Sequence, residues 1–508
     1  MLVCLLFLFS GCRQGKQNPN RDITMEAFSD LKTPAFDLSS RRIRENIVAM
    51  CVSNDSGRAE DKYIRSYYQN GGVFLWIDRY GVDERADTLL AFLRTVDDIG
   101  FSRGMFFVDD MERDLKLIRN FDFNGTDNNI NKVMARLEYC LTVAFMRYST
   151  GHYFGFVNPM YIFNRLDTIA DTPAGRPVVY KRLFDIDILR PGKEYFAAAL
   201  RHIYNDSVGE FLQRSQPEDT LYYVLKRKLK TATEAERMKI VCNMERLRWR
   251  EVNGLDTTGK YIVVNIPAFH LYAFGGSESL DMMVGCGARK TKTPLLSSEI
   301  ERMEVNPIWN IPVSIIKNEV AHHAGDADYF ERNRYNIIER ESGDLLDPEE
   351  VTVEMLKSGR YRVAQEGGEG NSMGRIVFRF PNQFSVFLHD TSSRSVFSRA
   401  VRSVSHGCVR VQKPFDLAAF LLDEPDEWLL DKLRISMDIK PETERGIKYI
   451  KNPDNKTKLV SGLKVQPRVP LLITYYTIYP NEKGVLSTYP DIYGYDDVIG
   501  AAIKPFMK

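Results

Sequence analysis

Residues Tyr261–Phe274 read YIVVNIPAFHLYAF, and the residue pattern changes at this point of the chain. Two apolar, β-branched runs, Tyr261–Ile266 and His270–Phe274, flank Pro267-Ala268-Phe269. Two such runs around a short link predict a β-hairpin. Further strands are expected over 280–285, 375–380, 384–389 and 471–479. We therefore predict a mostly β domain over residues 251–495, followed by a C-terminal tail over 496–508.

The segment of about 315–370 interrupts this β pattern. It is mixed and charged, and four glycines lie near its end. Its GGEGNSMG run matches neither a GK[ST] nor a GxGxxG phosphate loop. The segment is therefore predicted to be an inserted lid subdomain.

The chain before residue 251 has a helical period. Leu89, Leu90 and Leu93 share one helical face within Asp87–Val96, and Gly100 suits the stop that follows. Other amphipathic runs lie at 129–148, 220–230 and 233–251. The prediction is an α+β protein whose residues 39–250 form an N-terminal helical scaffold domain.

The first residues have the pattern of an export signal. Leu2–Phe9 is an apolar run too short to span a bilayer, and Ser10, Gly11 and Cys12 follow it. Small residues before a cysteine resemble a lipobox, so we expect residues 1–12 to be a lipoprotein signal and Cys12 to be lipidated. A buried N-terminal strand is the alternative. With 13–38 as a linker, the predicted location is the periplasm, anchored by lipid to the outer membrane of a Gram-negative bacterium.

Composition excludes several classes. The 508 residues include 69 Lys and Arg against 68 Asp and Glu, so no basic footprint predicts nucleic-acid binding. No apolar run reaches 18 residues, which excludes a multi-span membrane protein. Seven cysteines, widely spaced and without CxxC, fit neither a disulfide framework nor a zinc module.

The chemistry is predicted to lie in Phe384–Pro414, FSVFLHDTSSRSVFSRAVRSVSHGCVRVQKP. A thiolate rather than a thiol is the nucleophile, and a nearby imidazolium lowers a thiol pKa. His389, at the end of a predicted strand, and His406 both qualify as partners of Cys408. Arg410 adds positive charge and can hold a carboxylate.

The residues before the cysteine suit an exposed turn. Gly407 permits a tight turn, and the amides of His406, Gly407 and Cys408 are candidate donors to an oxyanion. Ser405 is expected to fix His406 by a hydrogen bond. Each residue alone has a structural explanation, but the set together points to a cysteine acyltransferase.

His389, fifteen residues, and then Ser405-His406-Gly407-Cys408 resemble the HX(14–17)[ST]HGC signature of the L,D-transpeptidases. Further similarity to the large, scaffold-bearing Gram-negative branch lies in MERLRW at 244–249, NPIWNIP at 306–312, FRFPN at 378–382 and LHDT at 388–391. Two departures stand out. The peptidoglycan-binding module of larger members is missing, and Phe387 replaces a tyrosine found in some relatives.

The resemblance implies the reaction. Cys408 would attack the third residue of a tetrapeptide stem, release D-Ala and pass the acyl group to a second stem as a 3→3 cross-link. His389 would act as base and acid, Ser405, His406 and Gly407 would shape the oxyanion site, and Arg410 would hold a carboxylate or the turn. The expected partners are peptidoglycan stems, with no cofactor or metal and no nucleic acid, and carbapenems would be inhibitors.

Alternatives stay open at this point. Water as acceptor would make the protein an L,D-carboxypeptidase, and other thiol hydrolases of wall peptides share the Cys–His pair. A non-catalytic wall-binding lipoprotein is a third possibility. His322 and His323 with Asp326 and Asp328 form a rival cluster whose ligand types could suit zinc.

Overall fold

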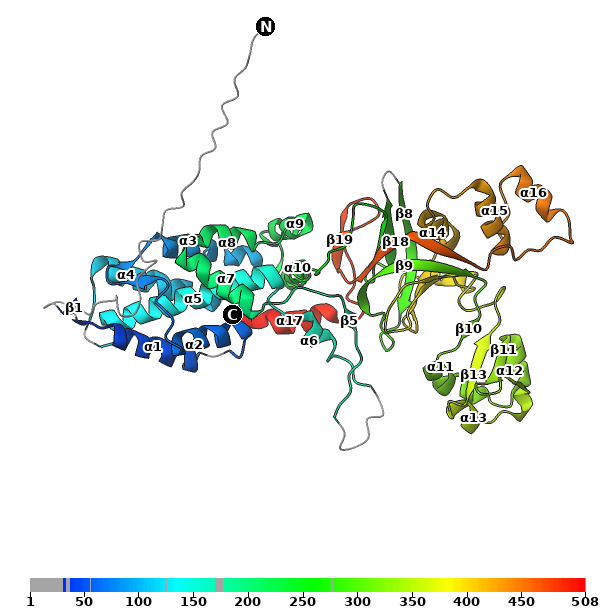
Figure 1. Cartoon of the computed structure of the whole chain (residues 1–508), viewed down its shortest axis with the longest axis horizontal. Coiled ribbons are helices and arrows are strands. Elements are labelled where there is room, and N and C mark those ends of the chain that lie inside the picture. Colours follow the sequence, from blue (N-terminus) through cyan, green and yellow to red (C-terminus); the bar gives the residue numbers. More distant parts are fainter. Residues whose placement is uncertain are drawn as a thin grey trace, which may run out of the picture. The chain divides into compact units, whose positions relative to one another are not determined.

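The computed structural model describes residues 31–32, 37–54, 56–124, 126–169, 177–275 and 278–507. The predicted signal over 1–12 with Cys12, and most of the predicted linker over 13–38, lie outside these residues. The chain divides into two compact units (Figure 1). One comprises residues up to Asn158 with Ile188–Val252 and the end of the chain from Asp496, and the other comprises Pro159–Asp187 and Asn253–Tyr495.

The first unit is helical, as predicted. Its helices are α1 (Ser40–Ser53), α2 (Ala59–Gln69), α3 (Glu84–Leu93), α4 (Val108–Asn120), α5 (Ile130–Phe154), α7 (Lys193–Tyr204), α8 (Val208–Arg214), α9 (Thr220–Leu229), α10 (Glu234–Arg246) and α17 (Tyr495–Ile503), with short helical turns η1 (Val96–Ile99), η2 (Arg103–Phe106) and η6 (Lys504–Phe506). Four short strands pair in it: β1 (Leu31–Lys32) with β2 (Asp37–Leu38), and β3 (Ile77–Asp78) with β4 (Gly81–Val82).

Helix α5 is the centre of this unit. It packs against α1, α2, α3, α4 and α8, and nearly all its residues are buried. One buried polar group on it, the Glu138 carboxylate, accepts hydrogen bonds from the Tyr68 hydroxyl and the Trp76 amide. The four helices expected at 87–96, 129–148, 220–230 and 233–251 are present as α3, α5, α9 and α10, with ends moved by a few residues.

Two details of this unit bear on the sequence predictions. Residues 496–508, predicted to be a tail, instead form most of α17 and all of η6, with Ile499, Ile503 and Phe506 fully buried. Ile499 and Ile503 lie four residues apart, the spacing of one helical face, and this spacing could have predicted the helix. Helices α9 and α10 are separated only by residues 230–233, so no module is inserted between them.

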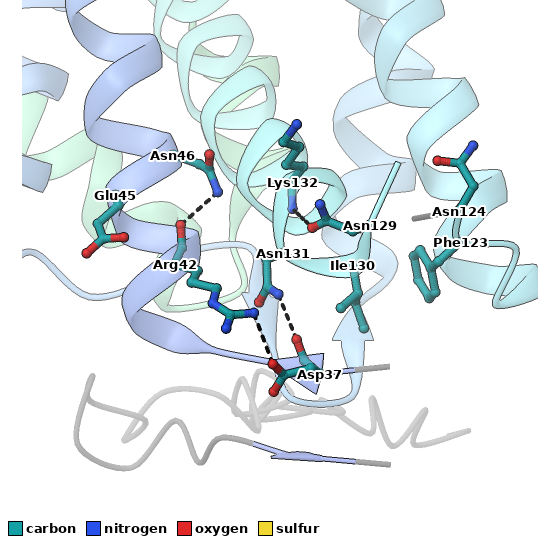
Figure 2. Close-up of a pocket in the computed structure, with 10 residues that line it drawn as sticks. All are labelled: Asp37, Arg42, Glu45, Asn46, Phe123, Asn124, Asn129, Ile130, Asn131 and Lys132. Carbon is teal, nitrogen blue, oxygen red and sulfur yellow. Dashed lines mark hydrogen bonds and ion pairs between the residues drawn. The ribbon is translucent and has the colours of Figure 1, made fainter. Parts of the chain in front are cut away.

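A pocket of about 490 Å³ lies between α1 and the start of α5 (Figure 2). The Arg42 guanidinium donates to the Asp37 carboxylate, and the Asn131 amide donates to the Asp37 carbonyl. The other charged residues of its lining are Glu45 and Lys132. The lining contains no cysteine, histidine or serine, so this pocket offers neither a Cys–His pair nor a hydroxyl nucleophile.

The second unit contains a closed β-barrel. Its wall runs in the order β14 (Ile376–Arg379), β15 (Leu388–His389), β17 (Val409–Val411), β8 (Glu278–Gly287), β7 (His270–Gly275), β6 (Tyr261–Asn265), β18 (Gly462–Thr474) and β9 (Leu295–Val305). Pairing of β14 with β9 closes the ring. The predicted hairpin is β6–β7, paired from Tyr261↔Phe274 to Asn265↔His270. This confirms the mostly β nature of the domain.

Short elements complete this unit. They are α6 (Pro159–Phe163), β5 (Phe184–Asp185), η5 (Arg394–Ser398), β16 (Ser403–Ser405), α14 (Pro414–Leu421), α15 (Glu427–Ser436), α16 (Glu444–Ile450), β19 (Ile478–Pro480) and β20 (Leu486–Thr488). Strand β5 pairs with β9, and β16 pairs with β8 beside the barrel wall.

A lobe with its own core is inserted between β9 and β14. It gathers α11 (Val313–Asn318), η3 (Val320–His323), α12 (Ala327–Arg332), η4 (Pro348–Glu350) and α13 (Val353–Lys357) with the sheet β10 (Trp309–Asn310), β13 (Tyr361–Gln365), β11 (Tyr335–Glu339) and β12 (Leu345–Leu346) (Figure 1). Its buried side chains include Ile316, Phe330 and Val363. The observed lobe spans Trp309–Gln365, close to the 315–370 expected for the lid.

Candidate active site

Strand register brings His389 and Cys408 to the same face of the barrel wall. Strands β15 and β17 are parallel neighbours, with His389 opposite Arg410. The Val409 amide donates to the Phe387 carbonyl over 2.9 Å, so the pairing extends to Phe387 and Cys408. Because side chains alternate along a strand, His389, Phe387, Cys408 and Arg410 project from one face. His389 and Cys408 are therefore diagonal neighbours on adjacent strands.

This face is the outside of the barrel. The alternate residues Phe378, Leu388 and Val409 are fully buried and fill the interior. His389 is nevertheless only 4% exposed, whereas Cys408 is partly exposed. The thiol is thus the more accessible member of the pair, as a nucleophile requires.

His389 is held in one orientation. Its Nδ1 lies 2.5 Å from the main-chain oxygen of Asp390, which assigns the proton of the neutral ring to Nδ1 and leaves Nε2 unprotonated. A backbone hydrogen bond with Met373 also acts on the ring. Burial, together with the nearby Arg410 guanidinium, lowers the pKa of His389 to about 4. The imidazole is therefore neutral near pH 7, the form that can act as a base.

The Asp390 carboxylate has a separate task. It accepts hydrogen bonds from the Arg375 amide, 2.8 Å away, and from the Arg394 guanidinium, 3.1 Å away. The main-chain carbonyl of Asp390, and not its carboxylate, is therefore the group in contact with the His389 ring.

The pKa of the Cys408 thiol is shifted in the direction opposite to the one expected from the sequence. Its Sγ lies 3.9 Å from the Ser385 carbonyl oxygen, and among the described residues it forms no hydrogen bond with either imidazole. Burial raises the pKa of Cys408, against the lowering effects of the Phe387 backbone, Arg379 and Arg410. The sequence argument expected an imidazolium to lower this pKa, but a neutral His389 cannot do so. The resting site is thus a thiol beside a neutral imidazole.

Ser405 and Gly407 shape the turn that carries the thiol. The Ser405 hydroxyl donates to the Cys408 carbonyl over 2.5 Å and accepts from the Gly407 amide over 3.1 Å. It therefore fixes the turn rather than His406. Gly407 has a φ of +123°, a conformation that residues with a Cβ rarely adopt.

Amides for an oxyanion are fewer than the sequence suggested. The Gly407 N–H is used by Ser405, whereas the N–H groups of His406 and Cys408 have no hydrogen-bond acceptor among the described residues. The Cys408 amide is therefore the nearest available donor to an acyl group on Sγ. The His406 ring points elsewhere: its Nε2 lies 2.7 Å from Glu319 in the inserted lobe.

Residues 287–293 support the Ser405–Cys408 turn by hydrogen bonds, and they were not predicted from the sequence. The Thr293 hydroxyl accepts from the Gly287 amide and donates to the Gly407 carbonyl over 2.8 Å. Thr291 donates to the Ser405 carbonyl, and the Tyr493 hydroxyl donates to the Gly287 carbonyl over 2.6 Å. Tyr493 lies about 200 residues after the two threonines, so no local sequence pattern links the three hydroxyl groups. The position of both threonines just after strand β8 is the one hint that the sequence offers.

Arg410 lies next to both reacting groups. It is the register partner of His389, and its charge affects the pKa values of His389 and Cys408. Its Nε is buried without a hydrogen-bond partner. The structure therefore leaves Arg410 able to bind an anion, in keeping with the carboxylate role considered for it.

The rival histidine cluster is an ordinary surface. The His323 ring stacks on Tyr329 with centroids 3.8 Å apart, and its Nδ1 lies 4.0 Å from Asp326. Within the described ranges, no group of three or more His, Cys, Asp or Glu side chains could hold a metal ion.

No helix in those ranges has both the length and the apolar character needed to cross a bilayer.

Comparison with known families follows the division into two units. The YkuD family, the L,D-transpeptidase catalytic domain, matches residues 259–437. The chain contains an L,D-transpeptidase catalytic domain. A scaffold domain family matches residues 61–229, in the helical unit. The L,D-transpeptidase domain therefore includes His389, the Ser405–Cys408 turn and the inserted lobe.

This chain is also similar to individual proteins. A Haemophilus influenzae protein, provisionally named an L,D-transpeptidase, is 29% identical over 321 residues, or 62% of this chain. The match spans 60% of that relative's length. An L,D-transpeptidase from Mycobacterium smegmatis is a solved structure that aligns with 15% identity and a TM-score of 0.20, over 42% of this chain and 58% of that one.

Proposed function

We propose that this protein is a peptidoglycan L,D-transpeptidase that works through a thioester on Cys408. The observation that carries the proposal is the diagonal placement of His389 and Cys408 on parallel strands β15 and β17 of an L,D-transpeptidase domain. Nothing in the mechanism needs an external energy source, because one acyl bond is exchanged for another.

In the first step the Cys408 thiol passes its proton to Nε2 of His389 as sulfur attacks the carbonyl of the third stem residue. The Cys408 amide is the proposed donor to the oxyanion. The C–N bond to D-Ala then breaks, and the imidazolium returns the proton to the leaving amine. A thioester and free D-Ala are the products of this half-reaction.

In the second step an amine of another stem attacks the thioester. His389 accepts a proton from that amine, and the sulfur leaves with a proton, which regenerates the thiol. The product is a 3→3 cross-link, whereas water in place of the amine gives a tripeptide and L,D-carboxypeptidase activity. The same acyl-enzyme makes carbapenems candidate inhibitors.

The raised pKa of Cys408 supports coupling of deprotonation to attack. A permanent thiolate would need a cation in contact with it, and burial outweighs the lowering effects of Arg379 and Arg410, so that the thiol is neutral at rest. A base at Nε2 would then generate the nucleophile only when a substrate carbonyl is in place.

The test is a digest of peptidoglycan tetrapeptide stems with wild-type and Cys408→Ala protein, read by mass spectrometry. We expect wild type to give an acyl adduct on Cys408, free D-Ala and 3→3 dimers, and Cys408→Ala to give none of them. Tripeptides without dimers would favour the carboxypeptidase. D-Ala release by Cys408→Ala would refute the thioester.

Periplasmic location and a lipid on Cys12 are also proposals, supported by the Leu2–Phe9 run before Ser10-Gly11-Cys12. Radiolabelled palmitate should label wild type but not Cys12→Ala.

A further inference from the structure

A row of cations crosses the barrel wall and ends at the nucleophile. Strands β9 and β14 place Arg302 opposite Arg379, and β18 places Lys464 opposite Arg302. On the other side of β14, the register with β15, extended by one residue, places Arg379 opposite Phe387. Phe387 in turn lies beside Cys408. Lys464, Arg302, Arg379, Phe387 and Cys408 thus form one line on the outer face, called here the cationic row.

Contacts confirm that these side chains share the face. The Arg379 guanidinium lies over the Phe387 ring, 4.2 Å from its centroid. The Glu304 carboxylate is held between the two arginines, with Arg379 at 2.7 Å and Arg302 at 2.5 Å. The charge of Arg379 also reaches Cys408, since it acts on the thiol's pKa.

The cationic row has more positive charge than its partners neutralise. Glu304 is shared by Arg302 and Arg379, and Lys464 has no ion pair among the described residues. Arg379 uses Nε and Nη2 on Glu304, which leaves Nη1 without a partner within the described ranges. Arg302 also lies 4.0 Å from Glu301, a carboxylate that Arg468 shares. The three cations thus face two carboxylates, and Lys464 and Nη1 of Arg379 remain able to bind an anion.

Such a row costs stability. Like charges directly opposite on neighbouring strands are destabilising, and Arg302 faces Arg379 and Lys464 in this way. Glu304 offsets the repulsion between Arg302 and Arg379, whereas no carboxylate among the described residues pairs with Lys464. Such a violation of a local pairing rule is expected where function requires it. Of these residues, Arg302 and Lys464 are exposed and Arg379 is half-buried, so a ligand can reach all three.

The length of the row fits a stem peptide. Neighbouring strands are about 4.8 Å apart, so Phe387 to Lys464 spans roughly 14 Å. An extended chain covers about 3.3–3.6 Å per residue, so a tetrapeptide has about the same length. Phe387 offers the peptide an apolar surface next to the sulfur.

We propose that the cationic row binds the carboxylates of the acyl-donor stem and aligns it across the strands toward Cys408. The inference rests on the proposed function and names the substrate feature that the site selects, namely free carboxylates along the stem. Arg379 is then a substrate-positioning residue, with Arg302 and Lys464 extending the subsite.

The test compares two tetrapeptide stems, one with free carboxylates and one with all but the C-terminal carboxylate converted to amides. Binding is measured by calorimetry on Cys408→Ala protein, and D-Ala release is measured on protein with Cys408 intact. The variants are Arg302→Gln/Arg379→Gln/Lys464→Gln and, as control, Lys451→Gln, an exposed lysine just after α16. Circular dichroism and the rate of Cys408 alkylation by neutral iodoacetamide show whether the fold and thiol survive.

We expect the triple variant to lose at least about tenfold in affinity and kcat/KM for the free-acid stem, as loss of a charge-assisted contact implies, and little for the amidated stem. Arg379→Lys in place of Arg379→Gln in the triple variant should restore part of the loss. Equal losses on both stems, or a triple variant that matches Lys451→Gln, would overturn the proposal. Failure of the proposed function looks different: wild type would then form no acyl adduct on Cys408 with either stem.

Discussion

At the scale of single residues, His389 combines burial with backbone hydrogen bonds to Asp390 and Met373. The sequence placed it at a strand end facing away from the apolar set, and this placement is correct. It did not predict that the ring would be 4% exposed, because covering residues such as Met373 come from a loop remote from the motif. Local sequence identifies the chemical group, whereas tertiary packing sets its charge.

The lowered pKa of His389 makes folding depend on pH. In the unfolded chain the pKa is about 6.5, and in the folded protein it is about 4. Between these values the unfolded state binds more protons, so stability is fully present above about pH 6.5 and is lost as the pH falls toward 4. The loss is on the order of 3 kcal/mol.

Denaturant unfolding of wild type and His389→Gln at several pH values checks this. The difference in unfolding free energy between them should change across pH 4–6.5 and be constant above it. His152 is also buried with a lowered pKa, so the variant keeps part of the acid sensitivity. A pH-independent difference would contradict the prediction.

At the scale of elements, strand register places the Ser405–Cys408 turn. The predicted strand over 384–389 is shorter than expected: β15 contains only Leu388 and His389, and Ser385 has a φ of +53°. The Asn382 side chain accepts from the Phe384 and Val386 amides and so bends the chain before the strand. Alternating apolar residues predicted β structure without revealing this asparagine turn.

Gly407→Ala tests the turn itself. At φ +123° an added Cβ is strained although it has room, and we expect a cost of about 1–3 kcal/mol in stability. Since the Cys408 amide follows directly, D-Ala release should fall at least about a hundredfold, as seen when an oxyanion donor is lost. The checks are thermal unfolding and D-Ala release.

Gly359→Ala is the matched control. Gly359 also has a positive φ, +78°, with no neighbour near its added Cβ, but it lies in the inserted lobe. It should lose similar stability and keep its activity. If both variants kept full D-Ala release, the turn would not need its glycine.

At the scale of the whole molecule, the matched family regions stop short of the folded units. The catalytic match ends at residue 437, yet β18 at Gly462–Thr474 lies between β6 and β9 in the barrel wall. The sequence predicted both regions and their order. It did not predict that residues 159–187 belong with the barrel unit or that 496–508 belong with the helices, because such long-range pairing has no local pattern.

A chain ended after Met437 should therefore fail to fold its barrel. Removing β18 leaves β6 and β9 with unpaired backbone groups and exposes buried side chains such as Ile262 and Ile300. We expect loss of cooperative unfolding and no acyl adduct on Cys408. A chain ended after Tyr495 should keep the adduct, and an active protein ended at Met437 would refute the role of β18.

Closure of the barrel wall affects when the site can assemble on the growing chain. A polypeptide is synthesised from its N-terminus, and Leu471 of β18 pairs with Ile262, more than 200 residues earlier. The thiol thus exists on the growing chain well before the wall that supports it is complete. Order of synthesis alone therefore delays assembly of the site until β18, the last strand of the barrel wall in sequence, has been made.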